Sequence, residues 1–534
     1  MLAFFLASHL LYLTGQGHHK EAAKAALEQT KLDSAVIEEM SLEILRQGVQ
    51  SSNSEEAMMA LFGASVAMNE KAEALFEVAY QNREPQIQLA ALAMIARFPS
   101  EASLYILNQA IGHAHPLIRL EAAFMLAEKK APQASIKIES LMHKMPPEVH
   151  FLFPRLFAKV GDEIAKKNLK KLLNHSEERT RTEAILAIGE AGRDDFLKEI
   201  RRALTHPDAS SKEAAAASLG YLKDESSIAE LEKAAKHPSP CVKVAALRAL
   251  VYLKQPWAEK ELEKLALEGD LFAIYALAEC PQAKDSLAGL LKSQDRSQRC
   301  NATLALLELK EAGAKEGLRD LLIKDARDFC FIPIFSTAGA LEAYRVVASA
   351  SQNMQDTAAG FEMSLRLREK VLRQTLEVND TLFFETAHLI LQQQQNDLVP
   401  LLMELIENKG SDAAKEFLKQ EEQRAGAPFI RAWAALALLR LKVEGPYEAK
   451  LQTWLKKEAS LDLIRFRPFV PQEKREGTLF ELTPNEKAAL FVATLETFIL
   501  RTPEKAISLL LEMIASDAGK NRFILAGLLL HAIQ

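Results

Sequence analysis

One residue position recurs every 31 residues through the first half of the chain. Alanine fills six of these seven positions and phenylalanine fills the other: Ala60, Ala91, Ala122, Phe153, Ala184, Ala215 and Ala246. A unit of this length has room for two helices of about 12 residues and two short turns. A fixed period is the sequence mark of a repeat architecture, in which each unit buries its apolar face only against its neighbours. We therefore predict an all-α fold, an α-solenoid built as a right-handed superhelix of stacked antiparallel helical hairpins.

The sequence inside one unit agrees with two helices. Glu183–Ile188 carries apolar residues at helical spacing, and Phe196–Leu204 supplies the second helix. His206-Pro207-Asp208 and His237-Pro238-Ser239 are predicted to separate one hairpin from the next, because Pro starts helices and Asp or Ser caps them. Small side chains in the recurring row let neighbouring helices approach to the lower end of the usual distance of roughly 8–10 Å.

Length and composition favour the same architecture. A single globular core stops growing at roughly 250–300 residues, so 534 residues require either several domains or a long, thin core. Only 21 Gly and 20 Pro occur in this length, which is typical of a helix-rich chain.

Three segments resemble the short HEAT repeats found in proteins of the phycobilisome-lyase type. They begin at Pro116 (PLIRLEAA), Glu178 (ERTRTEA) and Cys241 (CVKVAAL), and each places an aliphatic or polar residue and a basic residue shortly before small residues. Two later units are shorter, since Ala273 follows Ala246 by 27 residues and Ala302 follows after another 29. The resemblance implies a solenoid with a binding surface and does not identify what binds.

Four segments are expected along the chain. Residues 1–50 should form N-terminal hairpins, because the spacing of Leu13, Gly17, Ala22 and Ala26 is similar to a tetratricopeptide hairpin. Residues 51–325 hold the HEAT-like repeats, residues 326–425 irregular helical hairpins, and residues 426–534 C-terminal HEAT-like and capping helices. The specific elements expected in the last two segments are helices at 358–377 and 382–392, a HEAT-like unit at 429–457, and two or three helices in 483–534 that open at Pro484 and Pro503.

The apolar stretch Leu2–Leu13 is read as a first, buried helix. It lacks a preceding Lys or Arg and is too short to span a bilayer, so we predict no transmembrane segment and a cytoplasmic protein. Export through residues 1–13 and an envelope-associated solenoid remain the alternative.

A ladder of basic side chains follows the same register: Arg119, His150, Arg181, Lys212, Lys243 and, after the shortened units, Arg299. Such a strip would suit an acidic peptide or phosphates. The competing interpretation is that each cation pairs with a turn residue such as Glu177 or Asp208 and ties one repeat to the next. We name Arg119, Arg181, Lys212 and Lys243 as candidate partner-binding residues.

Two other groups of residues have competing interpretations. His175, His206 and His237 are also 31 residues apart. Equivalent positions on successive repeats lie roughly 10 Å apart, whereas zinc needs nitrogens at about 2.0–2.1 Å, so we predict turn capping and no metal site. The aromatic-rich run Phe329–Phe335 is predicted to cap the end of the regular repeats, with a hydrophobic docking patch as the alternative.

The charged, Pro-containing connection Arg465–Gly477 is the preferred contact site outside the repeats. Arg465, Arg467 and Phe469 combine Arg with aromatic residues, a mixture that often anchors interfaces. An extended connector packed over helices is the alternative. Deletion of Gln472–Glu476 is expected to impair partner capture without changing helicity.

No recognised catalytic motif occurs in the sequence, and Cys241, Cys280, Cys300 and Cys330 form no CxxC pair. A net charge of −6 does not favour a nucleic-acid partner. We predict a non-enzymatic scaffold or adaptor, without cofactor, that binds a protein or peptide along its concave side, lined by the second helix of each hairpin. An enzyme or enzyme subunit, either bilin-lyase-like or nucleic-acid-modifying, is the alternative from another class.

Overall fold

The computed structural model describes residues 2–29, 33–323, 329–348, 354–424, 427–458, 464–467, 481–516 and 518–534. Within these residues the chain forms 30 α-helices and four short strands, so the predicted all-α solenoid is confirmed. The chain divides into two compact units. The first combines Met1–Met125 with Val399–Gln534, and the second is Leu126–Leu398, inserted in sequence between the two parts of the first.

The second unit contains most of the regular repeats. Its helices from the end of α8 onward are α9 (Ala134–Lys144), α10 (Phe153–Val160), α11 (Glu163–Leu172), α12 (Glu178–Glu190), α13 (Leu197–Ala203), α14 (Ala209–Tyr221), α15 (Ile228–Ala234), α16 (Pro240–Tyr252), α17 (Pro256–Leu267), α18 (Leu271–Ala276), α19 (Lys284–Leu290), α20 (Arg296–Glu308), α21 (Lys315–Leu322), α22 (Met354–Val378) and α23 (Asp380–Gln392). Short 3-10 turns precede α13, α15, α19 and α21. Helices were predicted at 358–377 and 382–392, and α22 and α23 confirm both.

The recurring alanines form a buried row. Ala184, Ala215 and Ala246 lie on α12, α14 and α16 and are fully buried, as are Ala273 on α18 and Ala302 on α20. Helix α14 packs against both α12 and α16. The predicted register is therefore correct, including the two shortened units.

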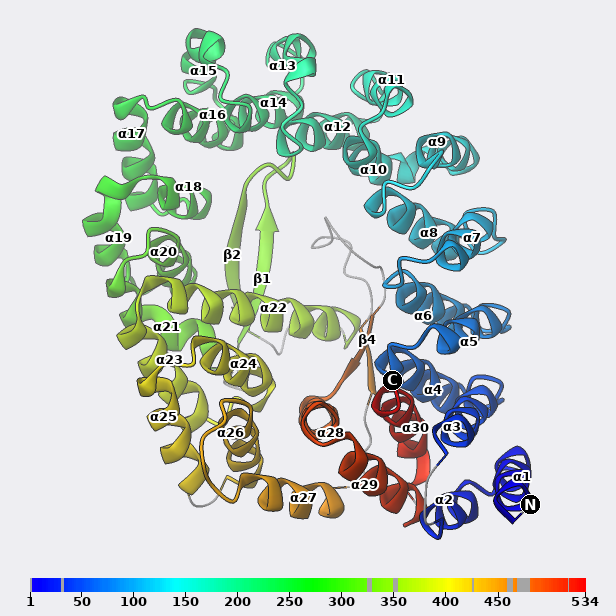
Figure 1. Ribbon diagram of the computed structural model, residues 1–534. Helices are drawn as coiled ribbons and strands as arrows, with labels where there is room; N and C mark the ends of the chain where they lie inside the picture. The colour runs from blue at the N-terminus through cyan, green and yellow to red at the C-terminus, as the bar shows by residue number, and fades with distance from the viewer. Residues whose placement is uncertain are drawn as a thin grey trace. The chain divides into compact units, whose positions relative to one another are not determined.

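The predicted boundaries between hairpins are wrong by one helix. Helix α13 packs chiefly on α14, and α15 packs chiefly on α16, so the His-Pro turns lie inside hairpins and not between them. Figure 1 shows α12, α14 and α16 on the inner side of this unit, towards strands β1 and β2, with α11, α13 and α15 on the outer side. With the predicted boundaries, α14 would be the first helix of its hairpin. It lines the inner side because it is the second helix of the hairpin α13–α14.

A β-hairpin replaces the helices expected at the start of 326–425. Strand β1 (Phe329–Phe335) pairs antiparallel with β2 (Glu342–Ala348). The aromatic and β-branched residues of both strands have high β-propensity, and Gly339 in the turn between them has a positive φ of 72°. The run 329–335 is therefore a strand, and its predicted role as a cap of the regular repeats remains a prediction.

The first unit is built from both ends of the chain. Its elements are α1 (Leu2–Gly15), α2 (His19–Leu27), α3 (Ser34–Val49), α4 (Ser54–Ala67), α5 (Glu70–Tyr80), α6 (Pro85–Ile95), α7 (Glu101–Ala110), α8 (Pro116–Glu128), α24 (Val399–Lys409), α25 (Asp412–Gln423), α26 (Pro428–Arg440), α27 (Tyr447–Lys457), β3 (Ile464–Arg467), β4 (Glu481–Pro484), α28 (Glu486–Arg501), α29 (Pro503–Ala515) and α30 (Arg522–Ala532). Helices α26 and α27 confirm the hairpin predicted at 429–457, and α28–α30 confirm the three C-terminal helices. Helix α28 begins after Asn485, because Pro484 ends β4.

The last helix of the chain packs between helices from its beginning. Helix α30 contacts α3 and α4, and α29 contacts α2, so a continuous row runs α26, α28, α30, α4 and α6 (Figure 1). Two glycines permit the contact. A Cβ added at Gly527 would lie 2.0 Å from the carbonyl oxygen of Gly63, and one added at Gly63 would lie 2.3 Å from that of Phe523. The two chain ends thus cover each other's apolar faces.

Candidate functional site

The basic ladder contains a side chain that joins consecutive repeats. Arg181 on α12 donates to the carbonyl oxygen of His175 at 2.8 Å, which belongs to the turn before its own helix. It also donates to Oδ2 of Asp208 at 2.7 Å and to Oγ of Ser211 at 2.9 Å, both at the start of α14. The Arg181 side chain is 12% exposed, and its guanidinium bonds to groups within the stack. These are the contacts expected if Arg181 ties one repeat to the next.

Arg299 and His150 occupy the same register and make related contacts. Arg299 donates to Oδ2 of Asp320 at 2.7 Å and to the carbonyl oxygen of Ser293 at 2.8 Å. Nε2 of His150 donates to the carbonyl oxygen of Met142 at 3.0 Å. Arg299 thus ties α20 to the turn that precedes it, whereas His150 bonds to the last turn of α9.

The remaining predicted ladder residues differ from Arg181. Lys212 on α14 and Lys243 on α16 are half-exposed, and Nζ of Lys212 lies 3.4 Å from Nε2 of His237. Arg119 lies on α8 in the first unit. The second unit therefore brings Arg181, Lys212 and Lys243 onto successive inner helices. Their role in partner binding remains a prediction.

The recurring histidines cap turns, as predicted. Nδ1 of His175 accepts a hydrogen bond from the backbone N–H of Glu177 at 3.1 Å, and Nδ1 of His237 accepts one from Ser239 at 3.1 Å. His206 makes a longer contact of the same kind at 3.4 Å. Burial lowers the pKa of His237, and nearby Lys212 lowers it further. The turn requires a neutral imidazole whose Nδ1 carries no proton, because Nδ1 accepts the hydrogen bond from Ser239.

Helix α20 holds strand β2 through the polypeptide backbone. Nδ2 of Asn301 donates to the carbonyl oxygen of Tyr344 at 2.7 Å, while Oδ1 of Asn301 accepts from the N–H of Tyr344 at 2.9 Å. One turn earlier on the helix, Oγ of Ser297 accepts from the N–H of Val346 at 3.1 Å. The side-chain amide of Asn301 thus makes the two backbone hydrogen bonds that a neighbouring strand would make to Tyr344.

The orientation of β2 explains the proline in β1. Because both backbone groups of Tyr344 point towards α20, Tyr344 forms a non-hydrogen-bonded pair with its partner Pro333. Proline has no N–H to donate, so it fits this position without loss of a ladder bond. The helix α20 and the strand β1 therefore complete opposite edges of β2.

The turn of the β-hairpin is seated on a buried carboxylate. The N–H of Ala338 donates to Oε2 of Glu213 on α14 at 3.2 Å, and Glu213 is fully buried. Burial raises the pKa of Glu213, against the opposing effect of the hydrogen-bond donors of the turn. The hydroxyl of Thr337 lies 3.9 Å from Sγ of Cys241 on α16. The β-hairpin is thus attached to α20 at one end and to α14 and α16 at the other.

Asn301 and Glu213 are not among the residues predicted from the sequence. Each is a polar residue one or two positions before a buried alanine of the register, Ala302 or Ala215. A polar side chain beside an otherwise buried row was the available signal. A cavity of about 470 Å³ also lies between the β-hairpin and the first turns of α18 and α20, with Asp270, Asp295 and Arg345 in its lining.

The predicted contact segment 465–477 is described only in part. Arg465 and Arg467 lie on β3, which pairs with β4, so this part is a strand. Phe469 and Gln472–Glu476 lie outside the described residues. Their proposed contact with a partner remains a prediction.

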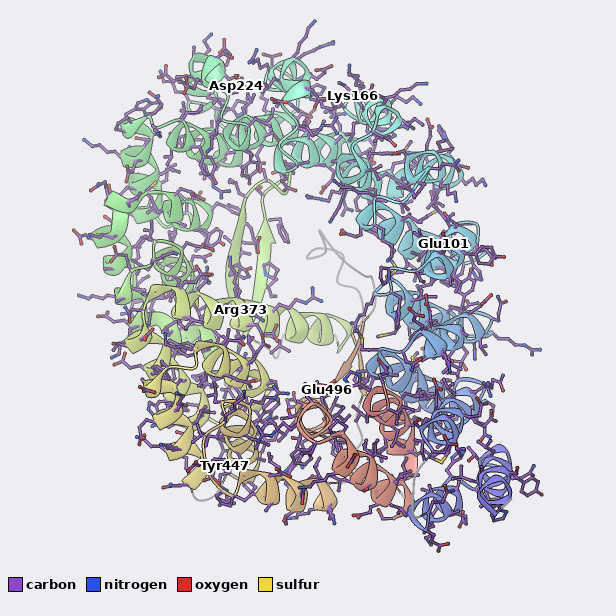
Figure 2. The ribbon with its side chains drawn as sticks, viewed as in Figure 1. Glu101, Lys166, Asp224, Arg373, Tyr447 and Glu496 are labelled. Atoms are coloured by element: carbon purple, nitrogen blue, oxygen red, sulfur yellow. The ribbon has the colours of Figure 1, made fainter. Side chains whose placement is uncertain are left out.

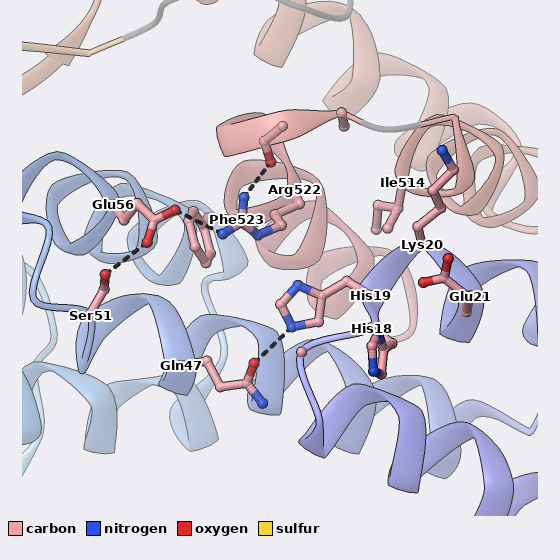
Figure 3. A pocket seen from close by; sticks show the side chains of 13 residues that line it. His18, His19, Lys20, Glu21, Gln47, Ser51, Glu56, Ile514, Arg522 and Phe523 are labelled. Carbon is pink, nitrogen blue, oxygen red and sulfur yellow. Dashed lines mark hydrogen bonds and ion pairs between the residues drawn. The ribbon is translucent and has the colours of Figure 1, made fainter.

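A polar pocket of about 410 Å³ lies where the two chain ends meet in the first unit. Figure 3 shows Arg522 from α30 bonded to Glu56 of α4 at 2.9 Å, and His19 of α2 bonded to Gln47 of α3 at 2.9 Å. Burial lowers the pKa of His19, and Arg522 opposes its protonation further. The pocket therefore adjoins the ion pair that joins α4 to the last helix, α30.

Burial keeps Cys280 and Cys300 in the protonated form. Burial raises the pKa of Cys280 and of Cys300 to about 12 in each case. At neutral pH both are thiols, which are poor nucleophiles and poor metal ligands. Among the residues described above, no group of three His, Cys, Asp or Glu side chains is placed to hold a metal ion.

Comparison with known proteins agrees with the helical register. The model of HEAT repeats matches residues 197–279, and its first residue is the first residue of α13. No curated protein matches the sequence. In the part of the chain that the structure describes, no helix is long and apolar enough to cross a membrane.

Several solved structures are similar to this chain. The CpcE–CpcF complex of phycocyanin lyase from Nostoc has 18% identity and a TM-score of 0.31, over 42% of this chain and 96% of that one. Yeast importin-beta has 12% identity and a TM-score of 0.34, over 94% of this chain and 73% of that one. Human deoxyhypusine hydroxylase has 14% identity and a TM-score of 0.22, over 52% and 98%. The family model thus matches HEAT repeats in residues 197–279, and the stacked hairpins of the described residues form a helical solenoid.

Proposed function

We propose that this protein is a scaffold that binds an extended segment of another protein along the inner side of its second unit. The observation that carries the proposal is the double hydrogen bond, at 2.7 and 2.9 Å, by which Asn301 on an inner helix holds an extended segment of the chain itself, strand β2, at Tyr344. A side chain that pairs with both backbone groups of a residue recognises an extended chain whatever its side chains are.

Three inner helices hold the chain's own β-hairpin by contacts of this kind. Helix α20 uses Ser297 and Asn301, α14 uses Glu213, and α16 presents Cys241 at the turn. Stacked repeats extend such contacts over a long surface without one deep pocket, which suits polypeptide ligands. Lys212 and Lys243 lie beside these contacts on α14 and α16, so an acidic segment is the favoured partner.

We further propose that the role is not catalytic. The raised pKa of about 12 at Cys280 and at Cys300 removes the two buried thiols as nucleophiles. Arg181 and Arg299 are engaged in tying repeats together and are not free to stabilise a transition state.

Affinity capture followed by quantitative mass spectrometry tests the proposal. The wild-type chain is compared with the double variant Lys212→Glu/Lys243→Glu and with Asn301→Asp, which keeps an acceptor for the N–H of Tyr344 but loses the donor. We expect a specific set of proteins to be depleted in Lys212→Glu/Lys243→Glu, whereas Asn301→Asp shows whether their capture needs the chain's own β-hairpin held on α20. Cross-linking should then join those proteins to the second unit.

The matched control is Lys198→Glu, because Lys198 is an exposed lysine on the outer helix α13. It changes the charge by the same amount per residue on the opposite side of the unit. Partners that are lost equally with Lys198→Glu are not bound by the inner helices. If neither inner-side variant changes the captured set, the proposed surface is wrong.

A further inference from the structure

A second surface, in the first unit and independent of the one proposed above, has the form of a groove. It has a volume of about 540 Å³ and is bordered by the end of α25, by α26 and by α27. Both α25 and α27 pack on α26, and the groove runs over α26 between them. Tyr447, labelled in Figure 2, marks the beginning of α27.

The floor and one wall of the groove present helical pairs of residues. Ala432 and Ala435, three positions apart on α26, form the floor. Leu451 and Trp454, three positions apart on α27, form the wall. Small residues at this spacing allow another helix to approach closely, and an aromatic side chain beside them supplies an apolar anchor.

The rim of the groove is cationic. Arg431, Lys450 and Lys457 line it, against the single carboxylate of Glu422. Glu422 is 8% exposed at its side chain and forms an ion pair with Lys450, so the charges of Arg431 and Lys457 remain in excess. The segment 465–477, which follows α27 in the sequence, has four Lys or Arg and two Glu, so its net charge has the same sign as the rim. Charge complementarity therefore favours an acidic occupant from another molecule.

We propose that this groove binds an acidic amphipathic helix of a partner protein. The apolar face of such a helix, with residues at i, i+3, i+4 and i+7, would cover Ala432, Ala435 and Trp454. Its carboxylates would face Arg431 and Lys457. This is a different partner chemistry from the extended segment assigned to the second unit.

The proposal is tested with the full chain and a defined peptide. The probe is a fluorescein-labelled synthetic helix of about four turns, with Leu at the four apolar positions and Glu elsewhere. Its twin carries Lys in place of every Glu. Fluorescence anisotropy should show binding of the Glu peptide that weakens as salt rises, and affinity for the Lys peptide that is lower by roughly tenfold or more.

Variants locate the binding to the groove. Arg431→Glu/Lys457→Glu should lower the affinity for the Glu peptide by roughly tenfold or more, so that the Lys peptide binds more tightly than the Glu peptide. Thr453→Trp, at an exposed lining position, should block the groove without altering its charge. The control is Lys456→Glu, because Lys456 is the neighbour of Lys457 but pairs with Glu512 at 3.3 Å and does not line the groove.

Each result decides the proposal. Loss of binding in the two groove variants, with Lys456→Glu within twofold of wild type, supports it. Equal binding of both peptides, or binding that the groove variants leave unchanged, overturns it. Self-association that Thr453→Trp abolishes, seen by sedimentation in place of peptide binding, would instead assign the groove to a second copy of the chain and also overturn it.

Discussion

At the scale of single residues, ion pairs across the repeat boundary account for many of the charged side chains. Arg181 reaches forward to Asp208 from the inner side, and Arg201 on α13 makes two 2.7 Å contacts to Asp224 on the outer side. Figure 2 shows Asp224 among the outer helices of the second unit. The Arg201 guanidinium holds the pKa of Asp224 well below its usual range. These pairs stabilise the stack as long as their carboxylates stay ionised.

Replacement of Arg181 by alanine should weaken the coupling between its repeat and the next. A hydrogen bond to a charged partner contributes about 1.5–3 kcal/mol, and the buried position of Arg181 limits screening by water. We expect Arg181→Ala to lower the local unfolding free energy of α12 and α14 by about 2 kcal/mol, measured by native-state hydrogen exchange. Lys198→Ala, at an exposed lysine, should change it by less than about 0.5 kcal/mol. Equal effects of the two substitutions would contradict the tying role.

The sequence showed where these cations lie but not what they contact. The 31-residue spacing placed Arg181 correctly on an inner helix. Its acceptors Asp208 and Ser211 are 27 and 30 residues away, and their hydrogen bonds depend on the relative height of two turns. Periodicity fixes that height only approximately, so pairing and partner binding were both compatible with the spacing.

At the scale of elements, the β-hairpin is the main departure from the predicted helices. Its strands are rich in aromatic and β-branched residues, a signal that was visible but was assigned to a cap. The sequence does not predict which helices the β-hairpin contacts, because Ala338 and Glu213 are 125 residues apart. A buried carboxylate beside the alanine row was the only local indication on the side of α14.

The attachment of the β-hairpin turn to Glu213 should depend on pH, because the pKa of Glu213 is raised. Below the pKa of an unfolded glutamate, about 4.3, the carboxyl is neutral whether the turn is docked or not. As pH rises towards the pKa of Glu213 in the folded protein, burial of the carboxyl under the turn opposes its ionisation. The stability that the contact between the turn and Glu213 contributes is therefore lost. Glu213→Gln imitates the neutral form. We therefore expect the amides of 336–341 to exchange at similar rates in both proteins near pH 4, and more slowly in Glu213→Gln at higher pH.

The comparison is made as a ratio of exchange rates at each pH, so that the intrinsic pH dependence of exchange cancels. Glu213→Ala is the control, because it removes the acceptor of the Ala338 N–H at every pH. It should exchange faster than Glu213→Gln throughout. If the ratio of the exchange rates of wild type and Glu213→Gln does not change with pH, ionisation of Glu213 does not affect the attachment of the β-hairpin turn.

At the scale of the whole molecule, the first unit depends on segments from opposite ends of the chain. Lys520 pairs with Glu55 and Arg522 with Glu56, across 465 and 466 residues. A repeat pattern specifies how each unit meets the next along the sequence. It contains no information about which units meet when the chain returns, so this contact could not be predicted from the register.

The close approach of α4 and α30 gives the sharpest test of this arrangement. A Cβ at position 527 would lie 2.0 Å from the carbonyl oxygen of Gly63, which is backbone and cannot rotate away. We expect Gly527→Ala to cost roughly 1–3 kcal/mol by overpacking and to speed hydrogen exchange in α3, α4 and α30 together. Helices α12, α14 and α16 should keep their protection, because repeats are coupled mainly to their neighbours. Gly289→Ala is the matched control: its Cβ would meet nothing within 4 Å, and an added methyl inside helix α19 should stabilise by roughly 0.5–1 kcal/mol. If Gly527→Ala speeds exchange in α30 alone and leaves α4 protected, the two ends of the chain do not support each other.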